Sequence, residues 1–515
     1  MRRFPALLIV CVLPVTVSAQ LDLNTLKREQ DARAMERKQQ SSQFQAERNT
    51  RWGEFLDARQ EQWAKTIANR DTEWTEFLSD SEWTVFDGFL TNKRPEEPKP
   101  DVVPQVETEP AVKPLPEPIV LPDEAIVTPD SEAPVEVEPE PLPCKPAAPE
   151  PEADRSRARL TFYGRAVSVP YDQSLKSYTG GKYTQKEIAA FWKTLSETDY
   201  TPTVTALIEE KDRMGLNDWG YYLLVNQFTQ RLYADRNCSA LLTWFILVRS
   251  GLDARVGYSN SGISLLLPTR TTLYDLNYVT MDGIKYYVVS NDTESGLRTY
   301  RNSYSGGHLF SFEQKKPLLL GGNNASRSLS FEFRGNKYTV DLNYDADLAE
   351  YYNALPQAQF EVYFGASPSV QLKQSIEANL RPVITGMDKP DALNFLLQFV
   401  QLSFDYKTDP QQFGHEKYFY ADELLIYPYC DCEDRSVLFS YLAHELLGYD
   451  VVGTEFPGHM ATAVETDYPV QGVKYTASGR TYTMADPTYI RASVGQCMSK
   501  YEKTTPIIHK IDFAK

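Results

Sequence analysis

The stretch CEDRSVLFSYLAHELLGY, residues 432–449, decides the fold of the second half of the chain. Its apolar residues recur at the three- and four-residue spacing of one helical face, and Gly448 can end the helix in a left-handed conformation. Cys432 therefore lies in the first turn of a predicted buried helix. The helix dipole favours a negative charge there and would lower the pKa of the thiol, although the carboxylates of Glu433 and Asp434 act in the opposite direction.

A histidine and an aspartate follow this helix at equal spacings. His459 lies 27 residues after Cys432 in the run GHMATAV, and Asp486 lies 27 residues after His459 in TYTMADPTYI. The runs GTEF, HMATAVET and RTYTMAD are predicted to be successive strands, so His459 begins one strand and Asp486 ends the next. There the carboxylate can hold the imidazole tautomer, and the imidazole can accept the thiol proton. The sequence predicts Cys432, His459 and Asp486 as a catalytic triad.

The residues around this triad resemble the transglutaminase-like superfamily of papain-type cysteine enzymes, in particular an exported bacterial branch. The resemblance covers residues 346–515 and is carried by DYKTDPQQFGHEKYFYADELLIYPYCDCEDRS, FPGHMATAV and ADPTYI. It implies a helix that begins with the nucleophilic cysteine and packs on an antiparallel sheet, which supplies the histidine and the aspartate. It also implies an acyl-enzyme, a thioester on Cys432, that passes to water or to an amine.

Several residues near the triad leave alternatives open. Cys430 is a competing nucleophile, although it lies out of phase with the start of the helix, and it is also able to pair with Cys497. His444 lies in the middle of the helix and His415 in a polar loop, so both are predicted to be structural or exposed. The backbone N–H of Cys432 is one natural donor to an oxyanion. A second donor is open among Gln411, Tyr427 and Tyr429.

Residues 235–257, DRNCSALLTWFILVRSGLDARVG, repeat the helix–glycine–strand layout of the predicted catalytic helix. An alignment of Gly251 with Gly448 sets one residue opposite each member of the triad. In the order nucleophile, base and acid, these residues are Asp235, Ile263 and Asp292. Cys238 lies about one turn away, but no histidine follows it within sixty residues. The pattern predicts an internal duplication whose first copy has lost its chemistry.

The first 19 residues have the three parts of a secretory signal. Arg2 and Arg3 are basic, residues 6–17 are largely apolar, and small residues precede Gln20. The apolar run is too short to cross a bilayer comfortably. We therefore expect a protein that is exported by a cleaved signal peptide and located in the periplasm or outside the cell.

Residues 20–92 are predicted to form a helical, coiled-coil-like segment. Trp52, Trp63 and Trp74 are eleven residues apart. Eleven residues are close to three helical turns, so the aromatic side chains lie along one stripe. The stripe is expected to be buried against the rest of the protein or against a helical partner, and a ligand-binding aromatic ladder is the alternative.

Residues 93–156 are predicted to form a disordered Pro/Glu-rich linker. Residues 95–155 hold 17 of the 33 prolines, and sixteen acidic against four basic residues. Such a composition favours extended, polyproline-like chain over a packed core. Most of the net charge of −17 therefore belongs to the linker, and neither a nucleic-acid-binding surface nor a basic membrane face is indicated.

The remaining chain is predicted to fold as two globular domains, 157–345 and 346–515. Residues 328–344, SLSFEFRGNKYTVDLNY, read as a hairpin that turns at Gly335–Asn336, and LNFLLQFVQLSF, residues 393–404, as a helix buried on most sides. The predicted fold class is α+β, with two tandem transglutaminase-like domains behind the helical segment and the linker. No metal motif and no cofactor motif is present, so neither is predicted.

These observations predict an exported cysteine amidase, peptidase or acyltransferase that acts on a protein or peptide, for which the cell envelope is one source. Transfer of the acyl group to water is slightly favoured over transfer to an amine. The alternative is a non-catalytic envelope scaffold or interaction protein that uses the same fold. Removal of the signal would leave five cysteines, an odd number that leaves at least one thiol unpaired within the chain.

Overall fold

The structure is a computed structural model of the chain. It describes residues 59, 61–94, 99–100, 102–106, 118–121, 125–128, 156–176, 183–289, 296–304 and 306–513. The chain divides into two units, residues 1–70 and 71–515, and the elements below belong to the second unit except where residues 61–70 are named. The predicted signal peptide, 1–19, lies outside the described residues. No helix in the described part of the chain is long and apolar enough to span a membrane.

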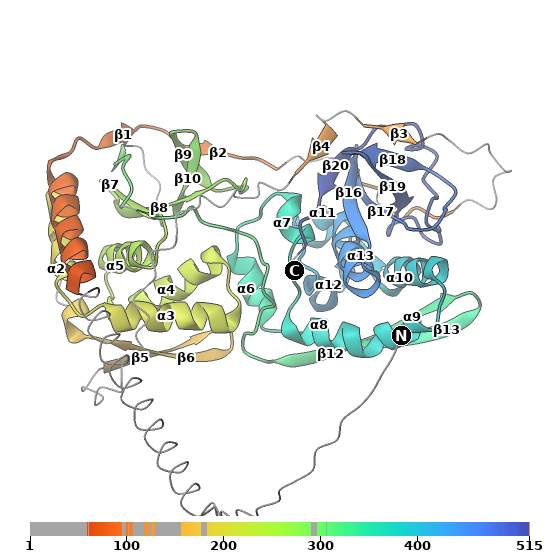
Figure 1. Cartoon of the computed structure of the whole chain (residues 1–515), viewed down its shortest axis with the longest axis horizontal. Helices are drawn as coiled ribbons and strands as arrows, with labels where there is room; N and C mark the ends of the chain where they lie inside the picture. Colours follow the sequence, from red (N-terminus) through yellow and green to blue (C-terminus); the bar gives the residue numbers. More distant parts are fainter. Residues whose placement is uncertain are drawn as a thin grey trace, which may run out of the picture. The chain divides into compact units, whose positions relative to one another are not determined.

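Helix α13, Cys432–Leu447, is the predicted helix, and it begins and ends where the sequence indicates. It starts at Cys432 and ends where Gly448 adopts a φ of 74°. It packs against α10, Lys389–Ser403, and against the strands β16, Asp450–Phe456, and β17, His459–Glu465 (Figure 1). Residues 432–443 are all buried as a result, so the prediction of a buried helix is confirmed.

The strands after α13 form the antiparallel centre of a seven-stranded sheet with the order β3-β18-β19-β17-β16-β20-β4. The further strands are β18 Lys474–Ala477, β19 Arg480–Ala485, β20 Ile507–Lys510, β3 Ile119–Val120 and β4 Ile126–Val127. His459 is the first residue of β17, and Asp486 directly follows β19. Because β17 and β19 are antiparallel neighbours, both residues lie at the same end of the sheet. The predicted strands are confirmed.

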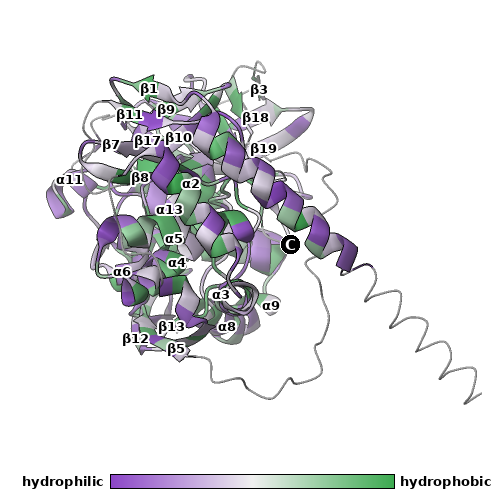
Figure 2. Cartoon of the chain, turned by 90° about the vertical axis from the view of Figure 1, so that its left-hand side faces the viewer, coloured by the Kyte–Doolittle hydropathy of each residue, from purple (hydrophilic) through white to green (hydrophobic). Residues whose placement is uncertain are grey.

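A second seven-stranded sheet, in the first half, has the order β1-β11-β7-β8-β10-β9-β2. Helix α5, Arg236–Arg249, directly precedes the central strands of this sheet in the chain. The ribbon of α5 carries mostly hydrophobic residues (Figure 2). The central strands are β7 Arg255–Ser259, β8 Gly262–Thr269, β9 Asn277–Met281, β10 Ile284–Val289 and β11 Leu297–Thr299. The order β11-β7-β8-β10-β9 repeats the order β20-β16-β17-β19-β18 of the other sheet. The described residues thus form a mixed α/β structure of curled antiparallel sheets and helices.

The residues aligned with the triad in the first half have structural roles. Asp235 is the N-cap of α5, where its carboxylate accepts hydrogen bonds from the backbone N–H groups of Asn237 and Cys238. Cys238 is buried, and this burial together with Asp235 raises the pKa of its thiol to about 12. Ile263 lies within β8. Asp292 lies outside the described residues.

Other elements complete the two halves. In the first half they are β5 Ser156–Phe162, β6 Arg165–Tyr171, η2 Gln173–Lys176, α2 Gln185–Ser196, α3 Thr201–Met214 and α4 Asp218–Leu232. The hairpin and the second half add β12 Asn324–Phe333, β13 Asn336–Asp345, α6 Leu348–Ala354, α7 Phe360–Phe364, α8 Val370–Asn379, α9 Arg381–Thr385, β14 Asp405–Tyr406, α11 Asp409–Gln412, α12 Glu423–Ile426 and β15 Tyr429–Cys430.

The hairpin of β12 and β13 turns one residue earlier than the sequence predicted. Phe333 pairs with Asn336, so the two turn residues are Arg334 and Gly335. Both have positive φ, 49° and 76°, which is the conformation of the tight turns that match the twist of an antiparallel pair. The predicted turn at Gly335–Asn336 is therefore wrong by one position, because Asn336 already belongs to the strand.

The segment predicted to be helical over 20–92 is helical in residues 61–80, and the ribbon of this helix carries both hydrophilic and hydrophobic residues in Figure 2. Trp74 is buried and packs edge-on against Trp192 and Tyr300, which confirms burial of this member of the aromatic stripe. Beyond the helix the structure differs from the prediction. Residues Thr84–Phe86 and Leu90–Thr91 form the strands β1 and β2, which pair with β11 and β9 of the first sheet.

The described residues of the Pro/Glu-rich segment also differ from the prediction of a disordered linker. The strand β3 pairs with β18 and β4 with β20, so this segment supplies both edges of the second sheet. Leu121 is buried in the core of that sheet, and Gln105 forms a bridge with Ile490. The apolar residues within the segment are few, but the edge strands offer them backbone hydrogen bonds and a place to pack.

Candidate functional site

His459 and Asp486 form a buried hydrogen-bonded pair. The imidazole Nε2 donates to Asp486 Oδ2 over 2.9 Å, and both side chains are almost fully buried. The other carboxylate oxygen accepts the backbone N–H groups of Thr488 at 2.8 Å and Tyr489 at 3.1 Å. Gln401 on α10 donates to the backbone oxygen of Asp486 at 2.9 Å. The carboxylate is thus held by the imidazole and two backbone N–H groups, while Gln401 holds the backbone of Asp486, and the carboxylate fixes the tautomer and direction of the imidazole.

The imidazole of His459 is held by ring stacking as well as by its hydrogen bond, and its second nitrogen is unpartnered among the described residues. The ring of Tyr501 stacks on His459 with centroids 5.4 Å apart and planes 4° apart, and the Tyr501 hydroxyl donates to Pro457 O at 3.0 Å. Among the described residues, the buried Nδ1 of His459 has no hydrogen-bond partner. A ring that donates through Nε2 carries a basic Nδ1, so this atom is able to accept a proton. No pattern in the sequence singled out Tyr501.

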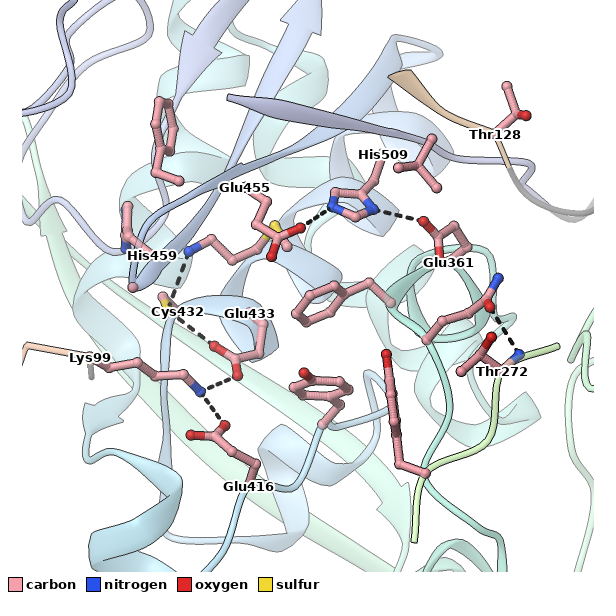
Figure 3. Close-up of a pocket in the computed structure, with 18 residues that line it drawn as sticks. Lys99, Thr128, Thr272, Glu361, Glu416, Cys432, Glu433, Glu455, His459 and His509 are labelled. Atoms are coloured by element: carbon pink, nitrogen blue, oxygen red, sulfur yellow. Dashed lines mark hydrogen bonds and ion pairs between the residues drawn. The ribbon is translucent and has the colours of Figure 1, made fainter. Parts of the chain in front are cut away.

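Cys432 lies in the same cavity as this imidazole. Its sulfur accepts the backbone N–H of Met460, the residue after His459, at 3.5 Å. The thiol in turn donates to Glu433 Oε2 at 3.0 Å (Figure 3). The structure therefore brings all three predicted triad residues to one site: His459 and Asp486 are bonded directly, and Cys432 lies beside the strand that His459 begins.

The thiol in this arrangement is protonated. Burial, together with the negative charges of Glu433 and Asp431, raises the pKa of Cys432 well above its ordinary value, whereas Lys99 and the N–H of Met460 lower it. Desolvation disfavours the charged form of a thiol, and at this helix start it outweighs the expected effect of the dipole. Our prediction of a lowered pKa does not hold for this arrangement. Ionisation of the thiol requires the proton to move to a base, and Nδ1 of His459 is the unpartnered one.

Lys99, from the Pro/Glu-rich segment, sits among four carboxylates beside Cys432. Its ammonium lies 2.7 Å from Glu416 Oε2, 2.7 Å from Asp431 Oδ2 and 4.0 Å from Asp409 Oδ2, and it also pairs with Glu433 (Figure 3). One oxygen from each of these four acids lies within 4.8 Å of the others. Such a cluster is suited to a cation, and the cation that the structure places there is the ammonium of Lys99.

Because one ammonium does not balance four carboxylates, their protonation states differ. Burial and the charge of Glu433 raise the pKa of Asp409 to about 8 and raise that of Asp431 well above its ordinary value. Burial also acts to raise the pKa of Glu433, but the adjacent Lys99 prevails and lowers it to about 2. Glu433 is therefore the acid of the cluster that ionises first, while Asp409 and Asp431 keep their protons to higher pH than usual.

The cavity has a volume of about 390 Å³, and three parts of the chain line it. The second half supplies Cys432 and His459. The first half supplies Thr272 and Tyr274, which are joined to the second half where Leu273 forms a bridge with Ala358. The Pro/Glu-rich segment supplies Lys99, Val127 and Thr128. A cavity of this size holds a short peptide segment or a side chain, and the first half and the segment both shape it.

His509 on β20 also lines this cavity, and our sequence reasoning missed it. Its Nδ1 donates to Glu361 at 2.7 Å and its Nε2 to Glu455 at 2.6 Å. Burial acts to lower the pKa of His509, but these two carboxylates raise it to about 9. The imidazole is therefore a cation at neutral pH. The sequence gives no signal for this cluster, because its three members come from distant elements and follow no motif.

The charge on His509 predicts a pH dependence of folding. A pKa raised from 6.5 to about 9 stabilises the fold fully below pH 6.5, and this stabilisation is lost as the pH rises through 9. The full effect is on the order of 3 kcal/mol. We expect His509→Gln to lower the free energy of unfolding, measured with urea, much more at about pH 6 than at about pH 10. His444→Gln should keep the wild-type pH dependence. Equal losses for His509→Gln at both pH values would contradict this assignment.

The competing cysteines lie outside the cavity. Cys430 is buried, with its sulfur 3.5 Å from Nε of Arg435 and 3.8 Å from the backbone oxygen of Asp405. Cys497 is partly buried and packs against the core of the second sheet. Both are free thiols, so the disulfide that the sequence left open does not form. Cys430 holds a buried arginine at the helix start and does not face the His459 imidazole.

The residues proposed from the sequence as second oxyanion donors are not among the residues that line the cavity. Gln411, Tyr427 and Tyr429 all fall outside the lining, whereas Tyr418 belongs to it. The hydroxyl of Tyr427 donates to Asn353, on α6. The two other histidines behave as expected: the ring of His444 stacks on Phe513, and His415 is exposed.

Comparison of the chain with protein-family models, with curated proteins and with solved structures finds no match in any of the three. The function of this protein is therefore argued from the geometry and chemistry of the cavity.

Proposed function

We propose that this protein is an exported cysteine-dependent amidase or peptidase of the transglutaminase-like type. One observation supports the proposal above the others. A buried histidine that is oriented by an aspartate lines the same cavity as Cys432, and its Nδ1 has no hydrogen-bond partner among the described residues. A nucleophile, a base and a residue that orients the base are the minimum set for covalent acyl transfer. The substrate is an amide of a protein or peptide, and the cell envelope is its expected source.

The proposed reaction passes through a thioester. Nδ1 of His459 takes the proton of Cys432, and the sulfur attacks the carbonyl carbon of the amide. The carbon–nitrogen bond then breaks as the imidazolium returns the proton to the leaving amine. A water molecule, deprotonated by His459, adds to the thioester, and the carboxylic acid leaves as the thiol is restored. Asp486 keeps Nε2 engaged throughout, so that Nδ1 stays directed at the reacting atoms.

Water is the acceptor that we favour, because hydrolysis needs no second substrate pocket. An amine acceptor would convert the same thioester into a new amide, which is the chemistry of a transglutaminase. Both reactions share the first half of the mechanism. They differ only in what enters the cavity after the amine has left.

The fold class proposed with this function is a tandem of two transglutaminase-like domains, 157–345 and 346–515. The repeated strand order, each time after a long buried helix, supports an internal duplication. In the first copy, Asp235 caps the helix, and the position where His459 pairs with Phe456 in the second copy is held by Gly262, which pairs with Ser259. The sequence alignment with Ile263 is therefore wrong by one position. The first copy is therefore proposed to be degenerate, with a role in shaping the cavity through Thr272 and Tyr274.

A second candidate function is a non-catalytic scaffold of the cell envelope. The observation in its favour is the raised pKa of Cys432, which leaves the thiol protonated and bonded to Glu433 in the described arrangement. A scaffold has no need of an ionised thiol. The two candidates differ in whether Cys432 can form a covalent bond with an acyl donor.

Reaction with p-nitrophenyl acetate tests the proposal without knowledge of the natural substrate. We expect a burst of about one p-nitrophenolate per chain, followed by slower turnover, because the thioester forms faster than it hydrolyses. Mass spectrometry of the quenched protein should locate the acetyl group on Cys432. Absence of the burst, or acetylation of lysines alone, would favour the scaffold.

A further inference from the structure

In the described part of the chain, the cation bound by the buried acidic cluster is Lys99, which lies outside the two globular halves in the sequence. It belongs to the Pro/Glu-rich segment, more than 300 positions before the acids that it contacts. Its side chain is 11% exposed. Burying an ammonium is costly unless charged partners surround it, so its partners hold this part of the segment in place.

The cluster is arranged directly around the thiol. Asp431 and Glu433 are the neighbours of Cys432 in the chain, and Glu433 joins the two functions: one carboxylate oxygen pairs with Lys99, and the other accepts the thiol hydrogen. Lys99 therefore acts on Cys432 through Glu433 and through space. Among the described residues that line the cavity, Lys99 is the one lysine or arginine.

We propose that Lys99 is a positioning residue that offsets the negative charge around Cys432 and thereby keeps the thiol reactive. This inference rests on the proposed function, and it extends the site to a segment of the chain that the sequence assigned to a linker. Without Lys99, any carboxylate of the cluster that is ionised would face the thiol with no counter-charge, and burial would raise the pKa of Glu433. The sulfur could then ionise only by placing a second negative charge beside the first, which is unfavourable in a buried site.

The charged and titratable groups around the thiol divide into those that favour the thiolate and those that oppose it. Lys99 is the cation beside the thiol that favours the thiolate by its charge, and His459 acts in the same direction once it has accepted the proton. The imidazolium of His509 also lines the cavity, but Glu361 and Glu455 pair with it. The carboxylates that oppose the thiolate are Glu433 and Asp431, and Asp409 and Glu416 belong to the same acidic cluster. The phenols nearby are Tyr406 and Tyr418. Removal of the one nearby lysine leaves the acids uncompensated.

The segment is fixed on both sides of Lys99. On the N-terminal side, Arg94 donates to the backbone oxygen of Glu416. On the C-terminal side, Tyr406 donates to the backbone oxygen of Pro100 at 2.9 Å, and Gln105 bridges to Ile490. These contacts fix the backbone on both sides of Lys99 and so hold its ammonium among the four acids, as a positioning role requires.

Alkylation of Cys432 by iodoacetamide, followed from about pH 6 to about pH 11 in the full chain, tests the inference. The Cys432 product is quantified by mass spectrometry, with fragmentation to separate it from Cys430. We expect Lys99→Met to slow alkylation near neutral pH by about tenfold or more and to move the rate profile to higher pH. The rates should converge at high pH, where every thiol is ionised. Lys99→Arg should restore most of the rate.

Two further variants separate charge from packing. Lys93→Met removes an exposed lysine six residues earlier in the same segment, which pairs only with the half-exposed Asp275, and its profile should match the wild type. The double variant Lys99→Met/Glu433→Gln removes the charge that Lys99 offsets, so its rate near neutral pH should recover relative to Lys99→Met. If methionine at position 99 unfolds the protein, Lys99→Gln gives the same comparison.

An unchanged profile in Lys99→Met would overturn the inference. A faster reaction in Lys99→Met near neutral pH would also overturn it, because Lys99 would then block access to the thiol. These outcomes are distinct from failure of the proposed function, which would appear as a wild-type protein that is alkylated at Cys432 but forms no acyl-enzyme with p-nitrophenyl acetate.

Discussion

Cys432→Ala should abolish covalent acyl transfer and leave the fold intact. We expect the burst of p-nitrophenolate to disappear and the rate of amide cleavage to fall by about a thousandfold or more, because no other group in the cavity can form the thioester. The side chain is small, and within the described residues its sulfur makes two hydrogen bonds, to Glu433 and Met460, so folding should change little. Circular dichroism and the urea midpoint measure the fold, and stopped-flow absorbance measures the burst.

Cys430→Ala is the matched control. It removes a buried thiol of the same size two positions away, whose sulfur contacts Arg435 and Asp405 and lies outside the cavity. Its burst should equal that of the wild type in the folded fraction, even if Arg435 loses some support. A full burst in Cys432→Ala, or loss of the burst only in Cys430→Ala, would show that the nucleophile has been assigned to the wrong residue.

His459→Ala should remove nearly all activity near neutral pH while Cys432 is still present. Burial and Glu433 raise the pKa of this thiol, so it depends on the imidazole to take its proton. We expect the acylation rate to fall by about a thousandfold and then to rise steeply with pH, as hydroxide replaces the missing base. The pre-steady-state rate of acylation between about pH 6 and about pH 10 measures this change.

His444→Ala provides the comparison for this variant. His444 is partly buried near the end of α13, where its ring stacks on Phe513 and its Nδ1 meets the backbone oxygen of Tyr449. Its loss should reduce stability slightly and leave the acylation rate unchanged. Equal activity in His459→Ala and in the wild type would remove the imidazole from the mechanism.

Local patterns in the sequence predict the part of the site that is built from neighbouring elements. The helical spacing over 432–449 and the strand-like runs after it place Cys432, His459 and Asp486 correctly at a helix start, a strand start and a strand end. These three positions follow from hydrophobic periodicity alone. Their convergence needs only the short connections of an antiparallel sheet, in which successive strands are usually neighbours.

The parts that sequence reasoning missed depend on contacts between distant elements. Average composition assigned residues 93–156 to a disordered linker, and an average does not show that Leu121 fills the core of a sheet or that Lys99 meets acids far along the chain. His509 was overlooked for the same reason, since Glu361 and Glu455 come from two other elements. Such clusters carry no periodic signal, because each member belongs to its own strand or loop.

Thr272 and Tyr274 of the first half line the cavity that contains Cys432, and this arrangement has a thermodynamic consequence. A molecule that fills the cavity touches both halves of the chain and the Pro/Glu-rich segment at once. Its binding free energy is then added to whatever keeps these three pieces together. Ligand binding and the association of the halves are therefore linked in both directions. A bound ligand stabilises the association of the halves, and any separation of the halves lowers the affinity for the ligand.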